Sequence, residues 1–276
     1  MDIQLAEQRI FALVEKLTLD QARQRAMDRR AGIFVSGISS LLQRPKPEEI
    51  ELIGSQERFD PFWHITCATH QVYDRVRKFN VPVSGPEVRA ITLHGEEYPV
   101  ASRAFGITAT EHCVEEDRQQ LFADGLSGEK QELGKLIGEA KNEMTDLSAI
   151  TSSGAILVVP PEVRASFVVR QILQQMVKPV QADTVHEETV KIESIDLYYR
   201  PVFAFEFRWK PKDKSGVVEI DGVTGEMRNA KALLQKLNLP VSRDALFDIG
   251  ADTIGMIVPG GNIAVKLAKV ALDSKK

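Results

Sequence analysis

The chain of 276 residues is 43% hydrophobic and 27% charged, with a formal net charge of -4. These values are typical of a soluble globular protein with one large domain or two of ordinary size, and they exclude a general electrostatic attraction to nucleic acid. No run of roughly 18 apolar residues could span a membrane, and the first residues, MDIQLAEQRI, do not resemble a secretory signal. Because two cysteines are too few for a disulfide framework, we expect a cytoplasmic protein.

Residues 1–44 are predicted to form an N-terminal helical segment. Thr18 and Gln21 fit a capping box, which starts the second of two helices. Pro45 and Pro47 then end any helix. The first helix is predicted from an apolar stripe at helical spacing, formed by Leu5, Ala6, Ile10, Leu13, Val14 and Leu17.

A strand-like stretch occurs twice in the chain. Residues 48–69 align without gaps with residues 188–209, so that Pro61 corresponds to Pro201 and many apolar positions coincide. Each copy is interpreted as a strand, a turn marked by the proline, and a second strand with bulkier side chains. The repetition predicts two related units of β-structure.

The surroundings of the two copies complete two sheet lobes. The first lobe, residues 45–113, is expected to contain further short strands, with residues 94–97 as a turn between two of them. The second lobe, residues 155–229, is expected to contain a short strand and a helix that stops near Lys178. Large side chains alternate with others in its aromatic strand, which indicates one buried sheet face rather than an RNA-stacking platform. These side chains are Phe203, Phe205, Phe207 and Trp209.

Two other segments are predicted to be helical. Residues 114–154 are rich in Glu, Gln and Lys and carry an apolar stripe, so they are interpreted as a helical connector that ends in a linker, residues 148–154. Residues 230–276 are interpreted as a helical tail in which Asn262 caps the last helix. The tail is expected to pack on its own domain or on a partner, and contact with a membrane surface is not favoured because aromatic anchors are missing.

The second lobe ends in the segment Val217–Met227, VVEIDGVTGEM, in which a strand reaches Asp221 and a Thr224-Gly225 turn follows. This segment resembles the terminal hairpin of PepSY-type domains. The resemblance implies a small α+β module associated with inhibition or regulation of other proteins rather than with catalysis.

The first lobe carries a cluster of residue types that bind zinc. His64, Cys67, His112 and Cys113 supply imidazole and thiolate groups, and His70 could replace His64. A regular strand would send His64 and His70 to one face and Cys67 to the other, and the repeat places Phe207 at the position of Cys67. Cys67 is therefore also interpreted as a small core residue. A Cys67–Cys113 disulfide and a cysteine nucleophile with a histidine base are alternatives that no local motif supports.

Together these patterns predict an α+β fold with two small antiparallel-sheet lobes, related by an internal duplication and flanked by amphipathic helices. The expected function is non-enzymatic: a cytoplasmic binding, scaffolding or assembly protein that contacts a protein partner or itself, with no nucleic acid and no cofactor. The alternative is a zinc-binding protein or zinc-dependent enzyme with its site at His64, Cys67, His112 and Cys113.

Overall fold

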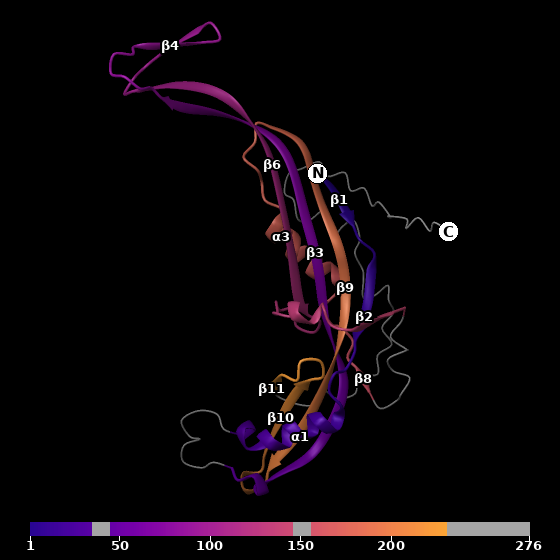
Figure 1. Ribbon diagram of the computed structural model, residues 1–276. Coiled ribbons are helices and arrows are strands. Elements are labelled where there is room, and N and C mark those ends of the chain that lie inside the picture. Colours follow the sequence, from indigo (N-terminus) through magenta and orange to yellow (C-terminus); the bar gives the residue numbers. More distant parts are fainter. Residues whose placement is uncertain (35–44, 146–155, 231–276) are drawn as a thin grey trace.

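The computed structural model describes residues 1–34, 45–145 and 156–230 (Figure 1). Within these residues one mixed sheet of nine strands dominates the fold, and a separate two-stranded sheet lies at one end of the molecule. The predicted linker, residues 148–154, and the predicted tail after residue 230, with its cap at Asn262, lie outside the described residues.

The prediction of an α+β fold with two small sheet lobes is wrong, because a long strand from each predicted lobe pairs with the other in one mixed sheet. Strand β3 (Ile50–Pro82) and strand β9 (Thr184–Trp209) pair antiparallel from Ile50 opposite Trp209 to Asp74 opposite Thr184. The repeated stretches are therefore neighbours in one ladder, and each strand serves both halves of a single continuous sheet.

The other strands line the outer edges of this central pair. On the β9 side, β1 and β2 are parallel to β9, β10 is antiparallel to it, β11 follows β10, and β7 follows β2. On the β3 side, β6 is antiparallel to β3 and β8 is parallel to it, while β4 and β5 form the separate hairpin. The bounds are β1 (Asp2–Leu5), β2 (Gln8–Leu13), β4 (Ala90–Leu93), β5 (Glu96–Pro99), β6 (Ala104–Asp124), β7 (Lys141–Met144), β8 (Leu157–Val158), β10 (Lys214–Asp221) and β11 (Met227–Ala230).

Two α-helices cover one face of the sheet. Helix α1 (Leu19–Arg29) has the predicted capping box, in which the Gln21 N–H donates to Thr18 Oγ1 and the Thr18 N–H donates to Gln21 Oε1. Helix α3 (Ala165–Met176) confirms the helix predicted before Lys178. Short 3₁₀ turns occupy Arg30–Phe34, Pro47–Glu49, Gly134–Leu136 and Lys210–Lys212.

Two of the predicted helices are wrong. The segment predicted as the first helix instead forms β1 and β2, and Ile10, Phe11, Ala12 and Leu13 are all buried because both sheet faces are covered at this point. The predicted connector, residues 114–154, begins as the second half of β6 and continues through a 3₁₀ turn into β7. Pairing with β3 supplies the hydrogen bonds of β6, so this strand forms without an apolar alternation of its own.

The predicted proline turns are also wrong, since β3 and β9 pass straight through Pro61 and Pro201. The N–H and C=O of a strand residue point to the same edge. The carbonyls of Pro61 and Pro201 accept from the N–H groups of Gly125 and Gly222, which lie just beyond the ends of β6 and β10. Each missing proline N–H therefore faces the end of a neighbouring strand and costs no ladder hydrogen bond.

The repetition has a structural counterpart, a local twofold relation between the two halves of the sheet. Asp60 and Arg200, which correspond in the aligned copies, lie directly opposite each other in the ladder. On either side of this pair, β3 continues into a hairpin with β6, and β9 continues into a hairpin with β10. The helix face of the sheet is filled around Trp63, Ile65 and Cys67 under α3, and around Phe203, Phe205 and Phe207 under α1, which confirms the predicted buried aromatic face.

Candidate functional site

Both hairpins end in the same six-residue turn, which the sequence writes as DGLSGE at residues 124–129 and DGVTGE at residues 221–226. In the second turn, Asp221 Oδ1 accepts from the Val223 and Thr224 N–H groups at 2.9 and 2.8 Å. Asp124 Oδ1 makes the equivalent pair of bonds in the first turn, both at 2.9 Å. The turn noted once in the sequence is thus a unit used twice.

The backbone geometry explains why two positions in each turn are glycine. Gly128 and Gly225 have φ of 73° and 72°, the left-handed region that favours glycine. A Cβ on Gly125 would lie 2.7 Å from the carbonyl oxygen of Pro61, and one on Gly222 would lie 3.0 Å from the Pro201 ring. Turn and proline therefore fit closely at the centre of the molecule.

The helices are tied to these turns in a crossed arrangement. The N–H groups of Lys16 and Leu17, just before α1, donate to the Gly222 carbonyl of the second turn. The N–H groups of Glu162 and Val163, just before α3, donate to the Gly125 carbonyl of the first turn. Each helix therefore packs on the hairpin of the other repeat, which explains why separate lobes do not form.

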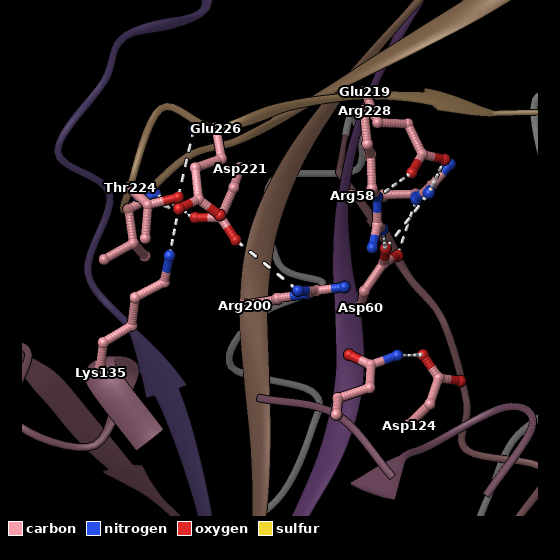
Figure 2. A network of polar contacts seen from close by, with 12 residues as sticks. Arg58, Asp60, Asp124, Lys135, Arg200, Glu219, Asp221, Thr224, Glu226 and Arg228 are labelled. Atoms are coloured by element: carbon pink, nitrogen blue, oxygen red, sulfur yellow. Dashed lines mark hydrogen bonds and ion pairs between the residues drawn. The ribbon is translucent and has the colours of Figure 1, made fainter. Parts of the chain in front are cut away.

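A buried ionic cluster lies beside the second turn (Figure 2). Arg58 and Asp60 alternate along β3 with Phe59, which is in the core under α3, so the cluster is on the sheet face opposite the helices. Arg58 donates from Nε to Asp60 Oδ1 at 2.7 Å and from Nη2 to Asp60 Oδ2 at 3.2 Å, and it also pairs with Glu219. Arg228 donates to Glu219 Oε2 at 2.6 Å and to Asp60 Oδ2 at 3.2 Å. Two arginines and two carboxylates thus form one closed network, and only Arg228 reaches solvent.

Electrostatics in this cluster favour the ionised carboxylates. Burial alone would raise the pKa of Glu219, but the charges and hydrogen bonds of Arg58 and Arg228 outweigh it and lower that pKa. Burial also opposes the charge of Arg58, yet Asp60 and Glu219 raise its pKa above the ordinary value. Arg58 therefore stays charged, and the network depends on its cation.

The symmetry-related place beside the first turn, within the described residues, has no such cluster. The counterparts of Arg58 and Glu219 there are Tyr198 and Phe122, and Tyr198 stacks on Phe62 with ring centroids 5.1 Å apart. The two halves of the molecule thus share a backbone arrangement beside the turns and differ there in chemistry. This difference marks the ionic cluster as a candidate site, because a duplicated scaffold alone does not require it.

The predicted zinc residues lie at separate positions along the sheet. His64 is buried opposite Phe122, and Cys67 is buried under α3, on the other face. His112 lies opposite Asp74 and Cys113 opposite Tyr73, in the outer part of β6. The step from Phe122 to His112 along β6 corresponds to roughly 30 Å, so the structure does not bring His64 and His112 together.

Each of these histidines has a carboxylate neighbour. His64 Nδ1 lies 3.5 Å from Asp196, and His70 Nδ1 lies 3.0 Å from Glu116. Asp74 lies between His112 and His186, with nitrogen–oxygen distances of 2.7 and 2.8 Å. Hydrogen bonds from His186 and then His112 lower the pKa of Asp74. No cluster of three or more His, Cys, Asp or Glu residues suited to a metal occurs within the described part of the chain.

Both cysteines are free thiols. Burial, with smaller contributions from Glu193 and Asp117, raises the pKa of Cys67 to about 12. Cys67 is thus an inert core residue at neutral pH, as its place in the repeat suggested. Cys67 and Cys113 lie opposite Gln119 and Tyr73 in the same ladder, a separation of about 20 Å that excludes the disulfide.

A second candidate site is the arm formed by the far ends of β3 and β6, which projects from the body (Figure 1). β9 leaves β3 at Asp74, so that Arg75–Pro82 pairs only with β6 among the described residues. This two-stranded ribbon is about 25 Å long, and the β4–β5 hairpin lies at its tip. The predicted turn between these last strands is confirmed, with positive φ at His94 and Gly95.

Comparison with protein-family models, curated protein sequences and solved structures finds no match for this chain. No helix among the described residues is long and apolar enough to cross a membrane.

The sequence analysis missed the ionic cluster, although the sequence contains two signals for it. Asp60 and Arg200 stand among aromatic and apolar residues, which is unusual for charged side chains at the centre of a sheet. The six-residue turn occurs twice, and only the second copy is followed by Met227 and Arg228 where the first has Lys130 and Gln131. Comparing the two turns would have located the difference.

Proposed function

We propose that this protein is a non-enzymatic binding protein that attaches to a protein partner through the β3–β6 arm. The supporting observation is the edge of β3 beyond Asp74, which has no strand partner within residues 1–34, 45–145 and 156–230. A ribbon of two strands buries too little apolar surface to stabilise itself. The length of the arm therefore extends the protein away from its body without adding to its stability. A structure of this kind is suited to contact with another molecule.

The two long edges of the arm differ in their readiness to pair. On β6, Glu111 lies within the arm, opposite Arg75, and Glu115, Glu116 and Asp117 follow in the adjoining part of the strand toward the body. Such charges discourage the addition of another strand. The edge of β3 instead borders an open groove of about 530 Å³, lined by Arg75, Val76, Arg77, Lys78, Gln181, Ala182 and Asp183. The β3 edge is therefore the expected docking edge.

The backbone at this edge is set up to continue the sheet. The Asp183 N–H donates to the Asp74 carbonyl at 2.9 Å, and the Val76 N–H donates to Asp183 Oδ2 at 2.6 Å. Since alternate residues of a strand point their N–H and C=O groups to the same edge, Lys78 and Asn80 face the open side next. An extended partner segment can add there as a further strand, and acidic side chains in it would complement Arg77 and Lys78.

The turn that resembles a PepSY-type hairpin fits this proposal, since the resemblance implies regulation of other proteins rather than catalysis. A cytoplasmic location is part of the same proposal, and the two free thiols support it because oxidising compartments favour disulfides.

A proline at Asn80 tests the proposal with little change to the arm. Asn80→Pro removes an N–H that faces the free edge and leaves the hydrogen bonds between β3 and β6 in place. We expect this variant to unfold at the same denaturant concentration as the wild type and to lose its partner in recovery from lysate of the source cells. Asn80→Ala, the matched control, should retain it. Equal recovery by both variants would refute docking at this edge.

A further inference from the structure

A small cavity of about 140 Å³ lies beside the second turn, next to the ionic cluster. Its lining separates charges, as Figure 2 shows: Asp221 and Glu226 lie toward the turn, and Arg200 and Arg228 lie toward β3. The lining residues are Arg200, Val202, Asp221, Glu226, Met227 and Arg228.

Arg200 is the lining residue with an unsatisfied donor. Its side chain is only 9% exposed, and Nη1 lies 3.8 Å from Asp221 Oδ2, beyond hydrogen-bond distance. Within the described residues, Arg200 Nε has no hydrogen-bond partner. Burial lowers the pKa of Arg200, and the nearby charge of Arg228 lowers it further. A guanidinium in this position gains from any acceptor that enters the cavity.

Comparison with the first repeat shows why the cavity exists. There Gln131 Nε2 donates to Asp124 Oδ2 at 2.7 Å and fills the space beside the turn. Arg228, the counterpart of Gln131, turns away and donates to Asp60 and Glu219. Asp221 Oδ2 therefore faces the cavity without the amide donor that its counterpart has.

The charges around the cavity already cancel in pairs. Arg228 belongs to the network of Asp60 and Glu219, Glu226 pairs with Lys135, and Arg200 is the cation closest to Asp221. An ion of either sign would disturb this balance. A ligand with an anionic acceptor at one end and a cationic donor at the other would satisfy Arg200 and Asp221 together.

We propose that the cavity binds a small zwitterion of the α-amino acid class. Its carboxylate accepts from Arg200 and Arg228, and its ammonium group donates to Asp221 and Glu226. The volume fits, because 140 Å³ is about the space of four or five waters at ~30 Å³ each, enough for glycine or alanine.

Amide chemical shifts and thermal unfolding of the full chain test the site with glycine and alanine as probes. We expect saturable shifts confined to the second turn, and a saturable rise in Tm, at millimolar ligand. Acetate and methylammonium at the same ionic strength should produce much smaller changes, because each offers only half of the pattern. Glycine betaine controls for a general osmolyte effect, since it keeps the charges but has no ammonium N–H.

Two variants separate binding from folding. Arg200→Met removes a buried charge with an unpaired N–H, while Asp221 keeps its hydrogen bonds from the Val223 and Thr224 N–H groups, so the variant should remain folded, with affinity for glycine reduced about tenfold or more. Arg208→Met, which removes an exposed arginine paired with Asp213, should bind as the wild type does. Absence of saturable shifts with glycine and alanine, an equal response to betaine, or unchanged binding by Arg200→Met would each overturn the proposal.

Discussion

Replacing Arg58 by methionine should destabilise the protein strongly. Arg58 is 4% exposed and provides the fully buried cation for Asp60 and Glu219. The substitution leaves two buried carboxylates that share only the half-exposed Arg228. Breaking a buried ion pair from one side typically costs ~3–5 kcal/mol, because a desolvated charge remains. We expect a loss of this size in the free energy of unfolding, measured by urea denaturation at pH 7.

The pH dependence of this loss gives a second readout. The pKa of Glu219 is held below its ordinary value of 4.5, so its pairing stabilises the fold above that pH and the stabilisation is lost as pH falls through the lowered pKa. In Arg58→Met most of this lowering is gone, so the difference from the wild type should be largest at neutral pH and shrink below pH 4.5. The triple variant R58M/D60L/E219M should cost less than the single one, since no carboxylate is left unpaired. A single-variant loss below about 1 kcal/mol at pH 7 would refute the reasoning.

Three other outcomes follow from the structure. Gly125→Ala should lose ~1–3 kcal/mol of stability, because its Cβ would lie 2.7 Å from the Pro61 carbonyl oxygen, and denaturation midpoints check this. Iodoacetamide at pH 8 should alkylate Cys113 and leave Cys67 unmodified until the protein unfolds, as peptide mass spectrometry would show, because burial holds the Cys67 thiol protonated. Asp74→Asn should change stability by less than ~1 kcal/mol at pH 7, because its ion pairs with His112 and His186 are open to solvent; a larger loss in denaturant titration would contradict this.

Local signals in the sequence predicted local structure well. The capping box at Thr18 and the glycine-containing turn at His94 each act within a few residues, and both form as expected. The aromatic strand was also identified, because alternation from Phe203 to Trp209 reports burial directly.

Failures of prediction arose where pairing partners decide the structure. The first 17 residues carry apolar side chains at a helical spacing, but they pair in parallel with the edge of β9 and form strands that are buried on both faces. Pro61 and Pro201 suggested turns, although their missing donors face strand ends. Neither circumstance can be read from the segment itself, because both depend on strand partners elsewhere in the chain.

The sequence revealed only part of the internal repeat. The aligned stretches contain Asp60 and Arg200, the pair at the centre of the twofold relation, but the alignment does not show that the copies face each other. The two DG turns lie at a different spacing because the arm lengthens the first hairpin. Because of this different spacing, the two turns do not align at the offset of the repeated strands. Aligning them would have revealed the residues that differ beside the second turn.

Site-specific photo-crosslinking tests the proposed binding role of the arm most directly. A photoreactive residue at Val76, 51% exposed at the free β3 edge, is compared with one at Phe167, 46% exposed on α3. After irradiation in the source cells, a discrete adduct with one protein should form at Val76, should be absent at Phe167, and should disappear when Asn80→Pro is added. Adducts of equal yield at both positions, or an adduct at Val76 that survives Asn80→Pro, would contradict docking on the arm.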